Sequence, residues 1–454
     1  MSINATNDKG YAALPENFTG VTGRGKPDLA IPSQVNASSS LNEILIFARQ
    51  ENASDVHLGA LKPIVFRKLG SLKSITTETL SADQISRLIN AVLPKDVHDS
   101  FEQTGDTEYV YTINGFGRFR MAIIKQRNGW DLTARLIPME IPKFENTGMP
   151  NSCANLTKWS QGMILISGPA GCGKTTTLAV LVEMINQNRH DHIVTIEEPI
   201  EIVYEPKLCQ ITQREINTHT LNQGNALRAA LREDPDILVV SELRDLSSIQ
   251  LAVTAAETGH LVLGTMNTVD AAQTISRVID SFPAEEQSIV RNMISESLRG
   301  VICQQLVPKK DGSGVIAAYE VLVVTSSVAN LIRSNKIAQI NNAMVTGKSY
   351  GMALMDNSLE NLANKQIISK KEACDRASNP AAMAQLIVQP PISKSKFLEL
   401  STNGETILSD LLQSGVLEEF SVTQVIVKPN TTLDEGIVKK IAKNDFEKIL
   451  NILQ

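Results

Sequence analysis

The sequence has few cysteines and no long uninterrupted apolar run. Its five cysteines are widely spaced and form no C-x-x-C pair, which argues against a zinc site and a disulfide framework. No stretch approaches the ~18 consecutive apolar residues of a membrane-spanning helix, so we expect no direct membrane span. The first residues carry neither a basic start nor an apolar run, so we expect no secretory signal and a soluble cytoplasmic protein.

Positive charge is not in excess either. The chain has 49 Asp and Glu against 43 Lys and Arg, a net charge of −6. Proteins that bind nucleic acid across a broad basic face have the opposite balance. Aromatic residues make up only 4% of the chain and no aromatic and basic stripe is visible, which counts against a nucleic-acid translocase. We therefore expect no nucleic-acid partner.

The 454 residues predict two or three domains with a sizeable core. A tail rich in Asn, Ser, Gly and Pro precedes mixed helical and strand-like runs, and a linker with three prolines follows them. Strands then alternate with helical patterns, which is typical of a parallel sheet flanked by helices. The predicted parts are a flexible tail (1–40), an α+β N-terminal domain (41–137), a linker (138–160), an α/β core with a helical C-terminal part (161–385) and a small appended module (390–454).

Two runs in the last third carry specific expectations. Residues 284–306 space their apolar side chains like one face of a helix, and residues 315–324 read as a short strand. The appended module contains a strand-like run over 421–428 and a helical pattern over 434–453. Its role is open.

A phosphate-binding loop is the strongest signal in the chain. Residues 168–175 read GPAGCGKT, which fits G-x-x-x-x-G-K-[ST] between a strand-like run and a helical one. Backbone N–H groups and the helix N-terminus would hold the phosphates of ATP, Lys174 would reach the β- and γ-phosphates, and the Thr175 hydroxyl would bind Mg²⁺. The predicted nucleotide-binding residues here are Gly168, Gly171, Cys172, Gly173, Lys174, Thr175 and Thr176.

Two acidic residues follow apolar strands downstream of this loop. Glu197 ends the run HIVTI, where it could act as a general base toward water. The alternative is an exposed acidic turn before Pro199. Glu242 follows the run ILVV as a Walker B carboxylate does, and would hold Mg²⁺. His260 opens another strand, and here a structural imidazole and a catalytic one are both open.

At this point the motifs resemble a family. GPAGCGKTTTLA, TIEEPIE, ALREDPDILVVSELRD and TAAETGHLVLGT are similar to motifs of the secretion-superfamily hexameric ATPases, and more narrowly of the PilT-like retraction ATPases of type IV pili. The resemblance covers residues 41–385. It implies a PAS-like N-terminal domain, a RecA-like core, a ring of six identical subunits with ATP bound between them, and hydrolysis of ATP to ADP and phosphate.

The resemblance also implies residue roles. Glu197 takes the position of the catalytic carboxylate, Glu242 that of Walker B and His260 that of the first histidine of the His box. Three arginines of the N-terminal domain, Arg118, Arg120 and Arg135, stand where the family's arginines reach a neighbour's γ-phosphate. The alternative for these arginines is a surface or strand-pairing role.

The resemblance also implies a cellular location and partners, and it leaves two alternative functions open. We expect a motor for pilus retraction (twitching motility or a related secretion or uptake process) at the inner face of the bacterial cytoplasmic membrane, with an inner-membrane platform protein and other pilus ATPases as partners. A pilus assembly or type II secretion ATPase is one alternative, against which the missing four-cysteine cluster counts. A weakly hydrolysing regulatory paralogue is the other, because Glu198, Ser241 and Asn267 depart from the family's usual Asp, Gly and His.

Overall fold

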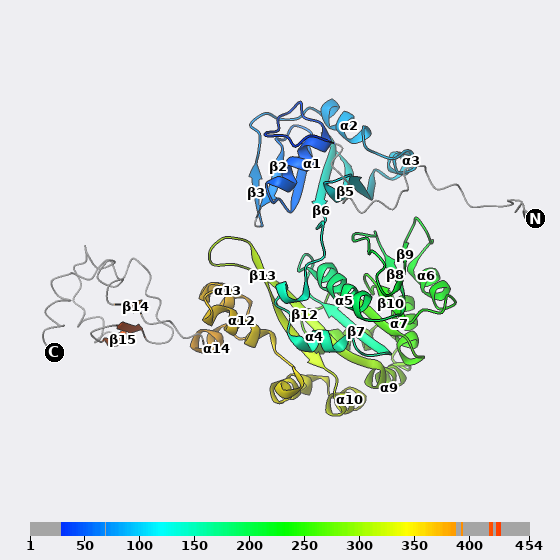
Figure 1. The fold of residues 1–454 in the computed structure, drawn as a ribbon, viewed down its shortest axis with the longest axis vertical. Coiled ribbons are helices and arrows are strands. Elements are labelled where there is room, and N and C mark those ends of the chain that lie inside the picture. Colours follow the sequence, from blue (N-terminus) through cyan, green and yellow to red (C-terminus); the bar gives the residue numbers. More distant parts are fainter. Residues whose placement is uncertain (1–28, 69, 387–391, 394–416, 421–423, 428–454) are drawn as a thin grey trace, which may run out of the picture. The chain divides into compact units, whose positions relative to one another are not determined.

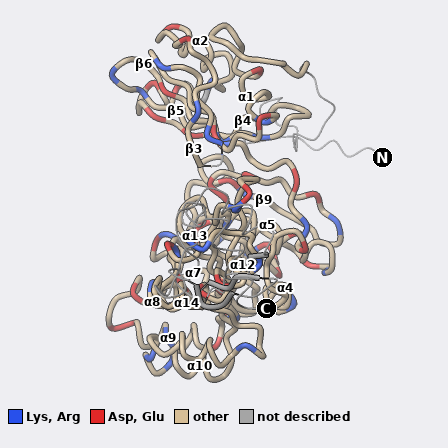
Figure 2. Tube along the Cα trace, turned by 90° about the vertical axis from the view of Figure 1, so that its left-hand side faces the viewer, with Lys and Arg blue, Asp and Glu red and all other residues tan. Residues whose placement is uncertain are grey.

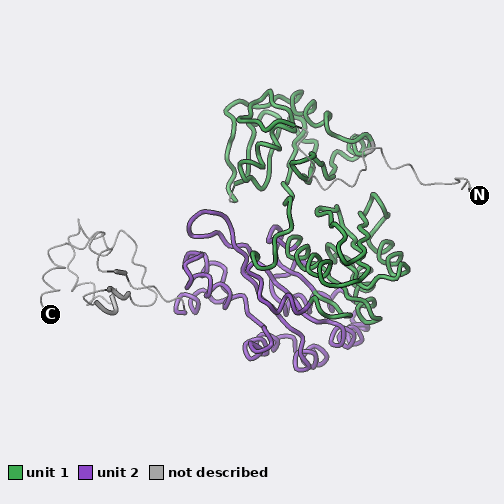
Figure 3. The backbone as a smooth tube through the Cα atoms, viewed as in Figure 1, with its two compact units in different colours: residues 1–147, 157–164, 175–265 green, residues 148–156, 165–174, 266–454 purple. Residues whose placement is uncertain are grey.

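The computed structural model describes residues 29–68, 70–386, 392–393, 417–420 and 424–427 (Figure 1). The chain forms two compact units (Figure 3). Unit 1 comprises the described residues up to 147, with 157–164 and 175–265, and unit 2 comprises 148–156, 165–174 and the described residues from 266 onward. Basic and acidic positions are intermixed along the described trace (Figure 2).

The N-terminal part of unit 1 is an antiparallel sheet with helices. Its strand order is β3-β2-β1-β6-β5-β4. The first helix starts at a capping box in which Ser40 and Glu43 bond each other's backbone N–H groups. Phe66, Phe101 and Phe119 are fully buried in the core. The elements are α1 (Leu41–Gln50), β1 (Asp55–Gly59), β2 (Val65–Lys68), β3 (Ser71–Ser74), α2 (Ala82–Asn90), α3 (Lys95–Thr104), β4 (Asp106–Ile113), β5 (Gly117–Gln126) and β6 (Gly129–Leu136).

A second sheet has seven strands in the order β13-β12-β7-β11-β10-β8-β9. Its strand β10 pairs in parallel with β8 and β11, and β8 pairs in parallel with β9. Strands β7, β10 and β11 are buried at every residue, as expected for strands covered on both faces. The elements up to residue 266 are η1 (Phe144–Asn146), α4 (Asn151–Leu156), β7 (Gly162–Ser167), α5 (Lys174–Asn188), β8 (His192–Glu197), β9 (Gln210–Glu215), α6 (Gln223–Ala230), β10 (Ile237–Val240), α7 (Leu246–Glu257) and β11 (Leu261–Met266).

From residue 271 to 386, unit 2 has two helices, an antiparallel strand pair and then further helices. The elements are α8 (Ala271–Asp280), α9 (Gln287–Ser297), β12 (Leu298–Pro308), β13 (Val315–Val323), α10 (Ser326–Arg333), η2 (Ile337–Gln339), α11 (Ile340–Thr346), η3 (Gly347–Tyr350), α12 (Met355–Asn364), α13 (Lys370–Arg376) and α14 (Pro380–Leu386). The predicted strand over 315–324 is confirmed by β13.

The helix predicted over 284–306 is present in the first half of that range and wrong in the second half. Helix α9 ends at Ser297, and the rest of the run is strand β12, which pairs with β13 from Gly300 to Pro308. A strand buried on both faces has no alternation of polar and apolar residues, so the run cannot be told from a buried helix by its period. The pairing with β13 decides its conformation.

Three short strands lie in the C-terminal stretch: β14 (Ile392–Ser393), β15 (Leu417–Phe420) and β16 (Gln424–Val427). Strand β16 falls inside the strand predicted over 421–428, and the three strands pair in the order β14-β16-β15. The predicted helix over 434–453 and residues 1–28 of the predicted tail lie outside the described residues. Within the described part of the chain, no helix is long and apolar enough to cross a membrane. The expected fold class, an α/β core with an N-terminal α+β part and a helical C-terminal part, is confirmed.

Candidate functional site

The candidate phosphate loop connects the fully buried strand β7 to helix α5. Gly168, Gly171 and Gly173 have φ angles of 147°, 76° and 91°, which residues with a side chain rarely adopt. A side chain at Gly168 would also collide with the carbonyl oxygen of Gln304 on β12. The backbone conformation therefore favours glycine at all three positions, and close packing adds to this at Gly168 and Gly173 but not at Gly171.

Lys174 begins helix α5 and turns back over the loop. Its Nζ donates to the carbonyl oxygens of Gly168 at 2.7 Å and Pro169 at 3.0 Å. Cys172 is buried, and burial raises the pKa of its thiol. Thr175 is exposed and Thr176 is half-buried in the first turn of the helix. A loop of this form, with a lysine and a hydroxyl at the start of a helix, fits a nucleotide triphosphate and its Mg²⁺ ion.

Glu197 is a buried carboxylate at the last residue of β8, with only 8% of the residue exposed. Its Oε1 accepts hydrogen bonds from the Thr195 hydroxyl at 2.7 Å and from the Gln213 amide at 2.9 Å. Burial raises the pKa of Glu197 to about 7, and both donors act in the opposite direction. The alternative of an exposed acidic turn is therefore wrong for Glu197, although Glu198 is exposed.

Glu242 lies just beyond the end of β10, the strand adjacent to β8. Its carboxylate accepts from the Arg244 guanidinium at 2.8 Å. The same arginine lies 3.6 Å from the carboxylate of Glu198. Arg244 thus lies near Glu242 and near Glu198, the residue that follows the predicted base, and both strands end at the same edge of the sheet.

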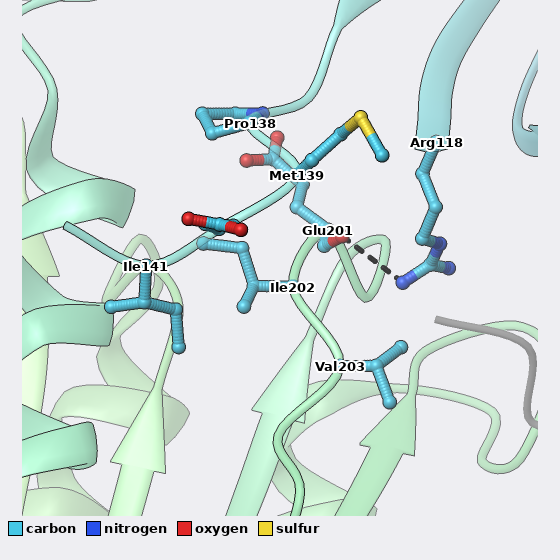
Figure 4. A pocket seen from close by; sticks show the side chains of 8 residues that line it. Arg118, Pro138, Met139, Ile141, Glu201, Ile202 and Val203 are labelled. Atoms are coloured by element: carbon cyan, nitrogen blue, oxygen red, sulfur yellow. Dashed lines mark hydrogen bonds between the residues drawn. The ribbon is translucent and has the colours of Figure 1, made fainter. Parts of the chain in front are cut away.

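Arg118 and Arg120 point to the same side of β5 and bind the same residue of unit 1. Arg118 Nη1 donates to the carbonyl oxygen of Glu201 at 3.0 Å (Figure 4), and Arg120 Nη1 lies 2.9 Å from its Oε1. Arg120 is also paired with Glu108. Burial lowers the pKa of Arg118, and Glu215, Glu197 and Glu201 counteract this by their charge.

Arg135, unlike Arg118 and Arg120, forms an ion pair within the N-terminal sheet. It stands directly opposite Asp55 in the β1–β6 pair, and its Nε lies 3.0 Å from the Asp55 carboxylate. Its side chain is 59% exposed. Of the three predicted arginines, Arg135 therefore fits the strand-pairing alternative in this structure, whereas the other two contact the loop after the acidic motif.

His260 does not lie where its expected catalytic role requires. It precedes β11, and its carbonyl oxygen accepts from the backbone N–H of Gly162 at the start of β7. Its Nδ1 lies 3.1 Å from the carbonyl oxygen of Ala255. Glu197 and Glu242 follow the other ends of parallel strands, and six residues of β11 at about 3.3 Å each separate the two edges. The structural imidazole is the interpretation that this placement favours.

Several contacts of these side chains were not predicted from the sequence. They are the two donors to Glu197 from Thr195 and Gln213, the pairing of Glu242 with Arg244, and the binding of two arginines by Glu201. Alternation along β8 would have pointed to Thr195, since residues two apart share a face. No local pattern indicates the contacts of Gln213 or Glu201, because both bridge segments distant in the sequence.

The fold and these residues can be compared with known proteins. The chain is 43% identical over 340 residues to the type IV pilus retraction ATPase PilT of Pseudomonas aeruginosa, covering 75% of this chain and 98% of that protein. It is 39% identical over 335 residues to a twitching motility protein of Neisseria gonorrhoeae, covering 74% of this chain and 89% of that protein. A crystal structure of the pilus retraction motor PilT with bound ADP matches with a TM-score of 0.69 and 37% identity, covering 76% of this chain and 99% of that one.

These likenesses bear out the predicted resemblance to PilT-like ATPases. The family model described as Type II/IV secretion system protein matches residues 33–377. That range includes the six-stranded and the seven-stranded sheet, the phosphate loop and the acidic residues at the ends of β8 and β10. With a match of this length and relatives of this identity, the chain belongs to the Type II/IV secretion system protein family, a family of ATPases.

Proposed function

We propose that this chain is an ATP-hydrolysing motor that powers type IV pilus retraction. The observation that carries the proposal is the 43% identity to PilT over 98% of that relative's length. The name of the gonococcal twitching motility protein supports the same direction of work. Six copies in a ring, an inner-membrane platform protein as partner and a position at the inner face of the cytoplasmic membrane belong to this proposal.

In the proposed reaction, residues 168–176 bind the phosphates and Lys174 contacts their outer oxygens. In this structure the Lys174 ammonium group donates to two carbonyl oxygens of its own loop. On nucleotide binding it would exchange these hydrogen bonds for bonds to phosphate oxygens. Thr175 and Glu242 would hold Mg²⁺, which supplies positive charge to the phosphate oxygens when bound. Glu242 would first release Arg244.

Glu197 is the proposed general base. A carboxylate with a pKa of about 7 takes up a proton readily near neutral pH, while part of the population stays ionised and able to act as a base. Thr195 and Gln213 both donate to Oε1, so Oε2 carries neither of these bonds and can receive a proton from water. Arg118 and Arg120 are proposed to reach a neighbour's nucleotide after leaving Glu201.

Steady-state phosphate release by the purified chain tests the proposal. Lys174→Ala and Glu242→Gln are expected to lower the rate by about 10²-fold or more, because each removes a charge that contacts the phosphates or their metal. Lys371→Ala, an exposed lysine on α13, is the matched control and keeps the rate. The motor hypothesis fails if the unmutated chain is no faster than Glu242→Gln.

The direction of work needs a cellular test. In a bacterium that lacks its own retraction ATPase, the chain should restore surface motility and reduce the number of surface pili. An increase in pili in a strain that lacks the assembly ATPase would instead support an assembly motor. In either strain, the Lys174→Ala variant should have no effect.

A weakly hydrolysing regulatory subunit is the second candidate. Its support is the Arg244 guanidinium, which lies near both Glu198 and Glu242. Glu198 is one methylene longer than the family's usual residue and can reach this arginine more easily. If this candidate is right, the unmutated chain hydrolyses ATP slowly and Glu198→Asp raises the rate. A fast unmutated chain excludes it.

A further inference from the structure

A buried carboxylate joins two helices in unit 2. Glu320 lies on β13 with 5% of the residue exposed. Its Oε1 accepts from the backbone N–H of Ala271 at 2.8 Å and its Oε2 from that of Met355 at 3.2 Å. These N–H groups begin helices α8 and α12, where negative charge is stabilised. One side chain thus fixes the start of both helices.

The carboxylate continues into a chain of buried polar groups. Cys303 stands directly opposite Glu320 in the β12–β13 pair, and a side-chain hydrogen bond joins its thiol to the carboxylate. The Ser167 hydroxyl donates to Cys303 Sγ at 3.1 Å. Ser167 is the last residue of β7, directly before Gly168 of the phosphate loop. The chain of contacts therefore ends at the base of that loop.

Thr274 joins this chain to the segment that follows β11. It is fully buried, and its Oγ1 lies 3.2 Å from Ser167 Oγ and 2.7 Å from Thr268 Oγ1. The single proton of this hydroxyl has two acceptors within reach, Ser167 Oγ at 3.2 Å and the carbonyl oxygen of Asp270 at 2.7 Å. One hydroxyl thus contacts the strand before the phosphate loop and two residues of the segment that follows Asn267.

Strand β12 also supports the loop directly. Gln304 is 3% exposed and follows Cys303, so its side chain lies on the opposite face of the strand. A Cβ atom at Gly173 would lie 2.9 Å from Gln304 Nε2, and one at Gly168 would collide with the Gln304 carbonyl oxygen. The loop is packed against Gln304 while the strand before it is bonded to Cys303.

We propose that Thr274 and Glu320 are positioning residues for the phosphate-binding loop, acting through Ser167 and Cys303. The inference rests on the proposed nucleotide site. A buried chain of hydroxyl, thiol and carboxylate groups is a costly way to fill a core, which apolar side chains fill without unsatisfied partners. Such a network is suited to fixing the position of the phosphate loop relative to residues 267–270, because each hydrogen bond requires a defined direction as well as a distance.

Thr274→Val is the first test, because valine keeps the shape and removes the hydroxyl. The affinity for a fluorescent ADP analogue is measured by titration, with KM and kcat for ATP and the melting temperature alongside. We expect the ADP dissociation constant and KM to rise about tenfold, the equivalent of one or two lost hydrogen bonds. Thr274→Ser should restore values within about twofold, because it restores the hydroxyl.

Ser297→Ala is the matched control in the same unit. Ser297 is buried on α9 and its hydroxyl donates to the Met293 carbonyl oxygen at 2.8 Å, remote in sequence from the loop. It should lower the melting temperature without changing ADP affinity. Glu320→Gln is the second variant, since its amide nitrogen cannot accept one of the two backbone N–H groups. We expect a rise in KM of the same size.

The outcomes separate the two proposals. If the unmutated chain binds no ADP, the proposed nucleotide site itself is wrong. If it binds ADP and Thr274→Val binds equally well at a lowered melting temperature, the residues are merely structural and the inference is overturned. If Glu320→Gln does not fold, Thr274→Val and its serine rescue still decide.

Discussion

The ends of strands β8 and β10 carry carboxylates in opposite surroundings. Glu197 is buried, accepts from two neutral donors and has its pKa raised to about 7. Glu242 has a side chain that is 24% exposed and an arginine partner at 2.8 Å. Burial disfavours the charged form of Glu197 and so raises its pKa, whereas Glu242 lies in an ion pair at a partly exposed position. Adjacent parallel strands thus hold one acid suited to proton transfer and one suited to a cation.

Replacing the buried acid should have the largest effect. Glu197→Gln removes the proton acceptor but keeps the shape, so we expect kcat to fall by about 10²- to 10⁴-fold. Nucleotide affinity should change little, because this side chain is not expected to bind phosphate. Single-turnover hydrolysis and ADP titration measure the two quantities. A kcat that falls less than tenfold would rule out Glu197 as the base.

Replacing the arginine-paired acid should act on the metal. Glu242→Gln is expected to lower the rate by about 10²-fold and to raise the Mg²⁺ concentration needed for half-maximal rate. The Mg²⁺ titration is the measurement, with Glu197→Gln as the comparison. If both variants shift the Mg²⁺ requirement equally, the two acids do not have separate roles.

The pH dependence of kcat/KM tests whether the raised pKa of Glu197 matters for the reaction. Its carboxylate must be ionised to accept a proton, so kcat/KM should rise with pH through about 7. The Thr195 hydroxyl stabilises the ionised form and lowers the pKa. Thr195→Val should therefore raise the pKa, move the acid limb to higher pH and reduce activity at pH 7 by about tenfold.

Thr195→Ser is the control for this profile, because it keeps the hydroxyl and loses only a methyl group. Its acid limb should coincide with that of the unmutated chain. An acid limb that stays in place in Thr195→Val would mean that another group controls the profile.

The smallest effect is expected at Arg244. Its side chain is 59% exposed, and exposed ion pairs contribute at most about 1 kcal/mol. Arg244→Gln should leave the melting temperature nearly unchanged and lower the Mg²⁺ requirement a few-fold, since it removes the cation that pairs with the Glu242 carboxylate. Arg333→Gln on α10 removes the ion pair with Glu296 of α9 and serves as the control. An increased Mg²⁺ requirement would contradict the competition that we infer.

Local patterns identified most of the strands and the phosphate loop. The loop is a contiguous motif whose glycines are needed at defined φ angles, so eight residues carry its signal. The acids Glu197 and Glu242 were found because each follows a buried strand, and carboxyl ends of parallel strands meet at one edge. The same rule places His260 at the opposite edge, because it comes before its strand.

Contacts between distant segments could not be found in this way. The helix expected across 298–306 became β12 because β13 pairs with it, and burial on both faces hides a strand's period. Three such contacts join residues that are far apart in the sequence. They are those of Glu201 with two arginines, of Gln213 with Glu197 and of Glu320 with the first residues of two helices.

The amino-acid sequence alone was enough for the class of fold and the position of the phosphate loop, because both follow from short-range spacing of residue types, and its motifs resemble those of a known family. The tertiary structure decided that Glu197 is buried with a raised pKa, which arginines form ion pairs and which buried groups contact the strand before the phosphate loop. These properties depend on burial and on bonds between distant segments, and neither is encoded in the spacing of neighbours.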